Sequence, residues 1–233
     1  MIIRREKFWK KVRKKEQGNN LFQIYLDDTC LKSDQGKKII LPRQLAEEVT
    51  REWNADVKID TIKNSFCTKF CFSVIDMTKR ERDNVIARLV AYGNCDPICY
   101  IAGEPTKLHE MQKNLYNPLI DWAEKFLSIK LNKGPGLLFI EQSSLNSGNI
   151  KMSLEELDNF HLTAVHELTK SLGSLFTSLA LYNNIVSPEL AWEVANVEDN
   201  FRIDVWGEVE EETLIKNENF DHFNKLVKIL KMI

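Results

Sequence analysis

The spacing of apolar residues changes near residues 76–79, and this change limits the folds open to the chain. Before it, short runs rich in aromatic and β-branched residues alternate with turn residues, as in an antiparallel sheet. After it, apolar residues recur at steps of three and four, as on the buried faces of packed helices. The sequence therefore predicts an α+β fold, with a small β-rich N-terminal domain at 1–77 and a larger all-α C-terminal domain at 78–233.

The first domain is expected to hold short strands joined by tight turns. These strands are predicted at 21–26, 29–32, 38–41 and 65–75. Between the last two, Pro42 favours the first turn of a helix. Leu45, Val49 and Trp53 follow at four-residue steps, so they share one face of that helix.

The second domain is expected to be a set of helices with recognisable ends. Helices are predicted to begin at Thr78, Asn117-Pro118, Ser153 and Ser187-Pro188. Gly93 is expected to end the first of them as a left-handed cap. Ser153 and Glu156 fit a capping box, and the helix that they open is predicted to run to Tyr182. The last helix should carry apolar residues as far as Trp206 and form a helical hairpin with its predecessor.

The charges nearly balance over the chain but are unevenly distributed. The totals are 32 basic and 34 acidic residues, which argues against a dedicated nucleic-acid binder. Residues 1–15 nevertheless contain eight basic residues and one acidic residue, which fits a solvated arm or, alternatively, a nucleic-acid contact. Residues 198–212 contain seven acidic residues and one basic residue. Trp206-Gly207 lies inside this acidic segment, which is typical of either core packing or a partner contact.

Signals for export or membrane insertion are absent from the sequence. No apolar run approaches the roughly 18–20 residues of a membrane-spanning helix, and the basic start has no apolar stretch behind it. We therefore expect a cytoplasmic protein without membrane insertion, or a mitochondrial matrix protein if the source is eukaryotic and a leader is missing. The five cysteines are an odd number, which favours reduced thiols.

The common catalytic motifs are also absent. The chain has no phosphate-binding glycine loop, no dinucleotide turn and no nucleophile elbow. His166-Glu167 begins like a zinc protease motif, but Lys170 stands where its second histidine belongs. His161 and His166 are five residues apart, about 140° around a helix, so they should not meet at one metal. An alternative reading remains a metal-dependent hydrolase that uses His161, His166 and Glu167 or the pairs Cys67/Cys71 and Cys95/Cys99. We expect the protein to have no catalytic residue and to bind no cofactor, metal or small-molecule substrate.

Several short segments, taken in order, resemble one protein family over roughly 200 residues. They are Lys7-Phe8-Trp9-Lys10, Leu26–Ser33, Glu52-Trp53-Asn54-Ala55, Asp96–Tyr100, Gln112 with Asn117–Ala123, Leu172-Gly173-Ser174, Glu198-Asp199 and Trp206-Gly207-Glu208. Together they resemble the assembly chaperone for the alpha subunit of the F-type ATP synthase head, the assembly factor 2 type. The chain departs from the family pattern at Asp28, Ser33-Asp34, Ile101, Tyr116 and Arg202, where glycine, Thr-Pro, arginine, tryptophan and glutamine are usual.

The resemblance implies a non-catalytic chaperone that binds the free alpha subunit. It would shield the surface that later pairs with the beta subunit and so promote assembly of the catalytic head. By carry-over, the expected partner-binding residues are Glu198, Asp199, Trp206 and Glu208. The residues expected to form a structural signature are Trp53, Asp96, Trp122 and Gly173. Core packing remains the alternative role for Trp53 and Trp206.

Overall fold

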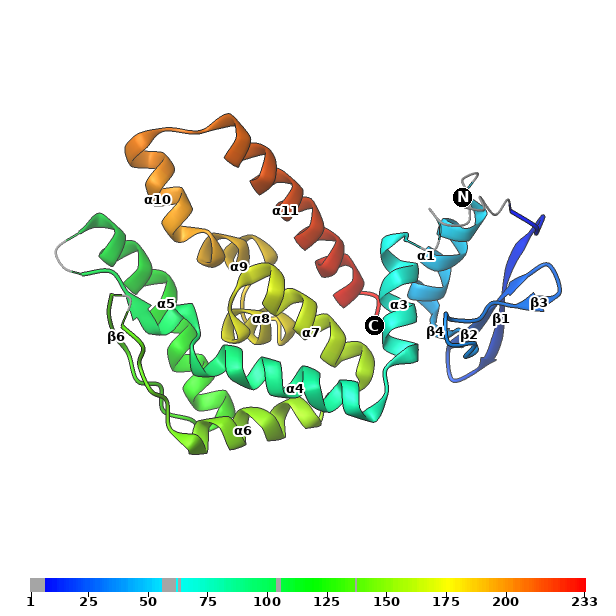
Figure 1. Cartoon of the computed structure of the whole chain (residues 1–233), viewed down its shortest axis with the longest axis horizontal. Helices are drawn as coiled ribbons and strands as arrows, with labels where there is room; N and C mark the ends of the chain where they lie inside the picture. Colours follow the sequence, from blue (N-terminus) through cyan, green and yellow to red (C-terminus); the bar gives the residue numbers. More distant parts are fainter. Residues whose placement is uncertain (1–6, 56–61, 63, 104–105, 137) are drawn as a thin grey trace, which may run out of the picture. The chain divides into compact units, whose positions relative to one another are not determined.

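The computed structural model describes residues 7–55, 62, 64–103, 106–136 and 138–233. The chain divides into two compact units, which are drawn in Figure 1. The first comprises residues 1–81 together with 228–233, and the second comprises residues 82–227. An antiparallel sheet lies in the first unit and helices dominate the second, so the predicted α+β class is confirmed.

The sheet is built around a single central strand. Its strands are β1 (Val12–Gly18), β2 (Leu21–Leu26), β3 (Thr29–Cys30) and β4 (Ile40–Pro42). Strand β2 pairs with β1 along one edge and with β3 and β4 along the other, always antiparallel. Strand β1 was not predicted, because its run of charged residues lacks the apolar alternation of a strand. Its backbone is nonetheless paired with β2, so part of the expected basic arm is an edge strand.

Among its described residues, the first unit also contains helices α1 (Arg43–Asn54) and α3 (Phe66–Asp76). Helix α1 follows Pro42 and buries the predicted stripe of Leu45, Val49 and Trp53. The strand predicted at 65–75 is wrong, because this segment forms helix α3. Its alternating aromatic residues also satisfy a helical spacing of three and four, which a short apolar run cannot distinguish.

The second unit consists mainly of helices. They are α4 (Lys79–Asn94), η1 (Pro97–Cys99), α5 (Lys107–Leu127), α6 (Ser144–Glu155), α7 (Asn159–Leu172), α8 (Leu175–Tyr182), α9 (Pro188–Ala195), α10 (Val197–Trp206) and α11 (Glu210–Leu230). The short strands β5 (Tyr100–Ile101) and β6 (Gly134–Pro135) form a parallel pair. The buried core is centred on residues such as Leu89, Ile120 and Phe176. Among the described residues, no helix has the length and apolar character needed to cross a membrane.

Two predicted helix ends are wrong. Gly93 does not end α4 with a left-handed cap, since the helix continues to Asn94. Asn117-Pro118 does not begin a helix, since Pro118 lies inside α5. The true start of α5 is Thr106, whose hydroxyl accepts a hydrogen bond from the N–H of His109 at 3.0 Å. Burial of Tyr116, Leu119 and neighbouring residues around Pro118 outweighs the lost backbone hydrogen bond.

The helix predicted from Ser153 to Tyr182 is also wrong, because the segment contains three helices. Ser153 lies within α6, and the next helix begins after Asp158, whose carboxylate accepts from the N–H of His161 at 2.9 Å. Gly173 then ends α7 with a φ of 71°. The later helix is divided in the same way, with α9 and α10 meeting at Asn196. The break at Asn183 and the cap at Ser187 are where the sequence placed them.

Candidate partner-binding site

Trp53 lies at the centre of a hydrogen-bonded cluster in the first unit. Its side chain is 2% exposed, and its indole N–H donates to the hydroxyl of Thr68 at 3.1 Å. That hydroxyl donates in turn to Glu52, which also accepts from the backbone N–H of Cys67 and Thr68 at 3.0 and 2.8 Å. Glu52 therefore satisfies two free N–H groups at the start of α3. Trp9 packs against Trp53 with ring centroids 5.1 Å apart, so this tryptophan organises the unit.

Asp96 is fully buried in the second unit and joins the starts of two helices. One carboxylate oxygen accepts from the N–H of Ile98 in η1 at 3.3 Å, and the other accepts from Phe176 in α8 at 3.1 Å. Burial raises the pKa of Asp96 to about 6, although these hydrogen bonds act in the opposite direction. The role of this side chain is to hold two helix N-termini together.

The other two expected signature residues, Trp122 and Gly173, lie on separate helices. Trp122 is half-buried on α5 and stacks on Phe126, with ring centroids 4.8 Å apart. Gly173 adopts a left-handed backbone conformation, and its N–H donates to the carbonyl of Thr169 at 2.8 Å. A Cβ atom at Gly173 would meet nothing within 4 Å, so its value is conformational and does not lie in close helix approach.

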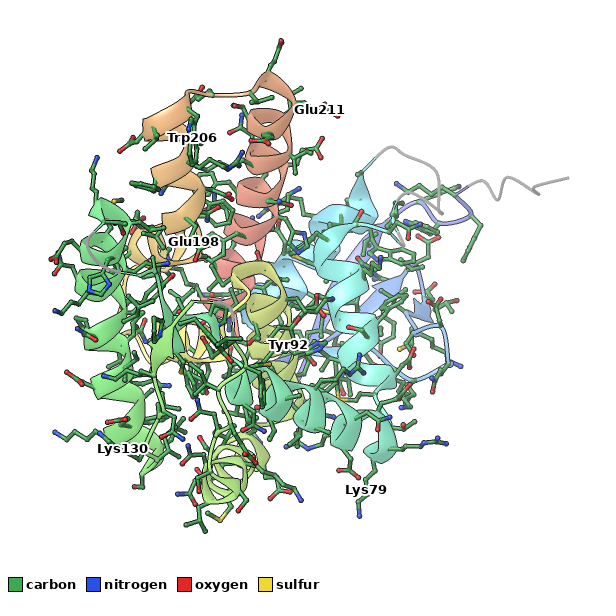
Figure 2. The ribbon with its side chains drawn as sticks, turned by 60° about the vertical axis from the view of Figure 1, so that its left-hand side comes forward. Lys79, Tyr92, Lys130, Glu198, Trp206 and Glu211 are labelled. Carbon is green, nitrogen blue, oxygen red and sulfur yellow. The ribbon has the colours of Figure 1, made fainter. Side chains whose placement is uncertain are left out.

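The four expected partner-binding residues lie along α10 and the turn that follows it. Trp206 is 73% exposed, which rules out core packing in this chain. Figure 2 shows Trp206 on α10 and Glu211 on α11, next to the turn that joins the two helices. Glu208 is exposed within that turn. Glu198 and Asp199 are in the first turn of α10, where negatively charged carboxylates interact favourably with the helix dipole.

Helix α10 contacts α5 near both of its ends. Glu198 accepts a hydrogen bond from the side-chain amide N–H of the buried Gln112 at 2.9 Å, and the side-chain amide oxygen Oε1 of Gln112 accepts from the backbone N–H of Ala102 at 2.7 Å. Near the other end, the ammonium of Lys107 lies 3.2 Å from Asp204. Glu198 is thus partly used inside the fold, whereas Trp206 and Glu208 remain turned to solvent. The segment is held in place without covering its exposed side chains.

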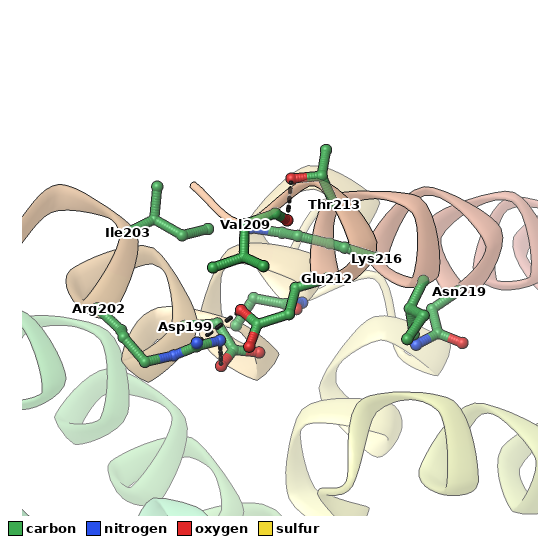
Figure 3. Close-up of a pocket in the computed structure, with 10 residues that line it drawn as sticks. Asp199, Arg202, Ile203, Val209, Glu212, Thr213, Lys216 and Asn219 are labelled. Atoms are coloured by element: carbon green, nitrogen blue, oxygen red, sulfur yellow. Dashed lines mark hydrogen bonds and ion pairs between the residues drawn. The ribbon is translucent and has the colours of Figure 1, made fainter. Parts of the chain in front are cut away.

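A groove of about 240 Å³ separates α10 from α11. Arg202 crosses it, and its guanidinium lies 3.2 Å from Asp199 and 2.6 Å from Glu212 (Figure 3). Ile203, Val209 and Ile215 add apolar surface to the lining. Closer to the core, Trp192 of α9 packs against Phe220 and Phe223 of α11. The groove therefore has apolar side chains in its lining and two ion pairs, both made by Arg202.

The two histidines considered for a metal site lie on α7, and each contacts different neighbours. His161 lies 2.9 Å from Asp158 and packs edge-on against Tyr182, while His166 lies 3.2 Å from Glu167. Burial alone would raise the pKa of Glu167, but hydrogen bonds from His166 and Lys170 bring it down to about 2. Across the part of the chain that the structure describes, no three ligand-type side chains gather as they would around a metal ion.

The cysteine pairs do not form a site either. Cys67 and Cys71 are buried together on α3, whereas Cys95 is exposed and Cys99 is buried. Burial raises the pKa of Cys67 and Cys99 to about 12, and it also raises that of Cys71. These three thiols therefore stay protonated near neutral pH and are poor nucleophiles and metal ligands.

Basic residues near the N-terminus bind within the first unit. Arg13 donates to the carboxylate of Asp28 at 2.7 Å and to the carbonyl of Asp27 at 2.8 Å. Lys14 pairs with Glu47 of α1, and Lys7 lies 5.7 Å from the centre of the Trp9 ring. Positions 1–6 of the predicted arm lie outside the described residues. Lys7, Arg13 and Lys14 thus have structural partners within the unit, which favours the structural interpretation over nucleic-acid binding.

Two polar residues that position these signatures, Gln112 and Glu52, are not evident as such from the sequence alone. Gln112 appeared only as one letter of a motif, although it connects α5 to Glu198. Glu52 likewise stood beside Trp53 in the motif but was given no role. A polar residue next to a buried tryptophan, on the core-facing side of a helix, is a usable signal, because buried polar groups need partners.

Comparisons with known proteins agree with this architecture. The family model described as ATP12 chaperone protein matches residues 6–124. The chain is 24% identical to the Schizosaccharomyces pombe protein named Protein atp12, mitochondrial, over 94% of this chain and 79% of that protein.

Solved structures show the same fold. A point mutant of Paracoccus denitrificans Atp12p is 25% identical, with a TM-score of 0.86 and 97% of both chains covered. An Agrobacterium tumefaciens protein described as a putative chaperone, Atu1473, is 24% identical, with a TM-score of 0.82 and coverage of 97% of this chain and 85% of that one. The family match spans just over half of the chain and agrees with the resemblance found in the sequence. The chain therefore belongs to the ATP12 family of ATP synthase assembly chaperones.

Proposed function

We propose that this chaperone acts by binding the free alpha subunit of F-type ATP synthase, without catalysing a reaction. Membership of the ATP12 family supports a role in ATP synthase assembly. The observation that carries the finer proposal is Trp206, a large aromatic side chain that is 73% exposed within an acidic segment. An exposed tryptophan costs solubility and adds nothing to a core, so a partner contact is its best explanation.

The surrounding geometry supports binding more than chemistry. Helix α10 is anchored to α5 through Glu198 at its start, and the exposed ion pair between Lys107 and Asp204 adds a weaker contact near its other end. A preorganised surface loses less conformational entropy when it binds. The histidines and buried cysteines that an enzyme would need are committed to local contacts or kept protonated.

Co-expression with the cognate alpha subunit tests the proposal. We expect the alpha subunit to become soluble and to elute with this chain as a complex that forms without ATP hydrolysis. The matched control is the same co-expression with the beta subunit, which should gain no solubility. An alpha subunit that stays equally insoluble with and without the chaperone, with no complex in the eluate, would refute the proposal.

A further inference from the structure

The groove between α10 and α11 presents apolar side chains to solvent. Val209 and Ile215 line it and are 53% and 54% exposed. Val205, Trp206 and Leu214 are further exposed apolar residues on the same two helices. Isolated exposed apolar residues are ordinary, but a concentration within one short segment marks an interaction surface.

Negative charges outnumber positive ones in the segment that borders this groove. Residues 198–212 contain seven acidic side chains and one basic side chain, Arg202, while Lys216 also lines the groove and Lys107 pairs with Asp204. Such a field repels nucleic acids and anionic membrane surfaces and attracts cationic groups. It therefore selects among the partners that an apolar groove could otherwise accept.

Arg202 shows which cationic group these carboxylates hold. Its guanidinium lies between Asp199 of α10 and Glu212 of α11, as Figure 3 shows. All three side chains are between 41% and 56% exposed, so water competes with both ion pairs. Exposed pairs of this kind contribute at most about 1 kcal/mol, and an arginine from a partner can therefore replace Arg202 at little cost.

We propose that this groove binds a client segment in which arginine or lysine side chains flank apolar ones, and that Arg202 occupies the cationic position until the client arrives. The inference rests on the proposed function, because it identifies the client as the free alpha subunit. Apolar side chains of the segment would cover Val209 and Ile215, and its basic side chains would pair with Asp199 and Glu212. The acidic rim increases the rate of encounter, and the apolar walls provide most of the contact area.

The test uses the full chain and the alpha subunit, with charge introduced into the groove. Val209→Lys puts a positive charge at an exposed apolar position, so it removes apolar contact and repels a basic client, and we expect it to weaken alpha-subunit binding at least tenfold. Leu145→Lys on α6 is the matched control, because Leu145 is 77% exposed and lies outside the groove. It should change the affinity less than twofold. Circular dichroism and thermal unfolding of both variants establish that they are folded.

Arg202→Gln provides a second measurement that does not depend on the apolar walls. Releasing Asp199 and Glu212 makes the groove more negative, so alpha-subunit affinity should rise severalfold at low salt. This gain should shrink toward nothing at about 1 M salt, where screening acts over roughly 3 Å. A photo-crosslinker placed at Ile215 should react with an alpha-subunit peptide that contains both basic and apolar residues.

The outcomes separate this inference from the proposed function. If the alpha subunit binds normally to Val209→Lys and does not crosslink from position 215, the groove is not the docking site, although the chaperone function stands. If Arg202→Gln weakens binding at low salt, Arg202 does not compete with the client and the exchange is refuted. If the alpha subunit fails to bind the unaltered chain, the proposed function and this inference fail together.

Discussion

Asp96 is a carboxyl group with no exposed surface, and its protonation is coupled to folding. Burial raises its pKa to about 6, against 3.8 for the free side chain. In the unfolded chain the group ionises near pH 4, whereas in the folded chain it stays protonated until about pH 6. Its contribution to stability is therefore complete below pH 4 and is lost as the pH rises through 6, by about 3 kcal/mol in all.

Asp96→Asn should remove this dependence on pH. At pH 4.5 we expect the variant to be less stable than the unaltered chain, because the amide cannot accept from the N–H groups of both Ile98 and Phe176. The deficit should shrink by about 2 kcal/mol between pH 4.5 and pH 7. Urea unfolding at intervals of half a pH unit measures it. Asp27→Asn is the control, since backbone hydrogen bonds from Lys11 and Lys10 lower the pKa of Asp27 and place its titration below this window. Parallel stability curves for Asp96→Asn and the unaltered chain would contradict the assignment.

At the level of elements, glycine positions distinguish close packing from backbone conformation. Gly93 lies within α4, and a Cβ atom there would be 2.9 Å from Ile150 and 3.1 Å from Leu175. Gly148 lies within α6, and a Cβ atom there would meet nothing within 4 Å. The sequence presents both simply as glycines in helical segments. Only the packing of α4 against α6 and α8 shows that Gly93 is at a position with little room for a larger side chain.

Alanine at these two positions should have opposite effects. Gly93→Ala should destabilise the chain by about 1–3 kcal/mol, because the methyl group overpacks the core. Gly148→Ala should stabilise it by about 0.5–1 kcal/mol, because alanine restricts the unfolded chain and favours helix. Thermal unfolding of the two variants in one buffer is the measurement. Equal effects of the same sign would show that helix propensity alone governs both sites.

The elements that the sequence predicted correctly are those whose signals are local. Thr78 and Glu81 form a reciprocal capping box at the start of α4, and the hydroxyl of Ser187 caps α9. The elements that it missed depend on distant residues. Helix α3 begins where Glu52 of α1 accepts two of its N–H groups, and β1 exists because β2 pairs with it. The candidate site divides in the same way. Its acidic residues and Trp206 are visible in the sequence, whereas the groove and the anchors to α5 require the fold.

At the scale of the whole molecule, the basic segment near the N-terminus and the acidic segment 198–212 differ in how their side chains are used. In the first unit, described basic side chains such as Arg13 and Lys14 are paired with nearby acids. In the second unit, Arg202 is the one basic residue within the acidic segment 198–212, and it pairs with Asp199 and Glu212. Trp206 and Glu208 of this segment remain exposed. A balanced net charge therefore combines a basic segment used for structure with an acidic segment available for binding.

Two of the tryptophans in the family-like segments, Trp53 and Trp206, test this division between stability and binding. Trp53→Ala should lower the free energy of unfolding by about 3–5 kcal/mol, because it opens a cavity and leaves the hydrogen bond from the indole to Thr68 unmade. Trp206→Ala should change stability by less than about 0.5 kcal/mol, since its ring is mostly in solvent. It should nevertheless weaken alpha-subunit capture at least tenfold, as expected for an aromatic anchor at an interface. Urea unfolding and quantitative pull-down on the same preparations measure both properties. If Trp206→Ala kept full capture of the alpha subunit, the exposed end of α10 would lose its role as the recognition surface.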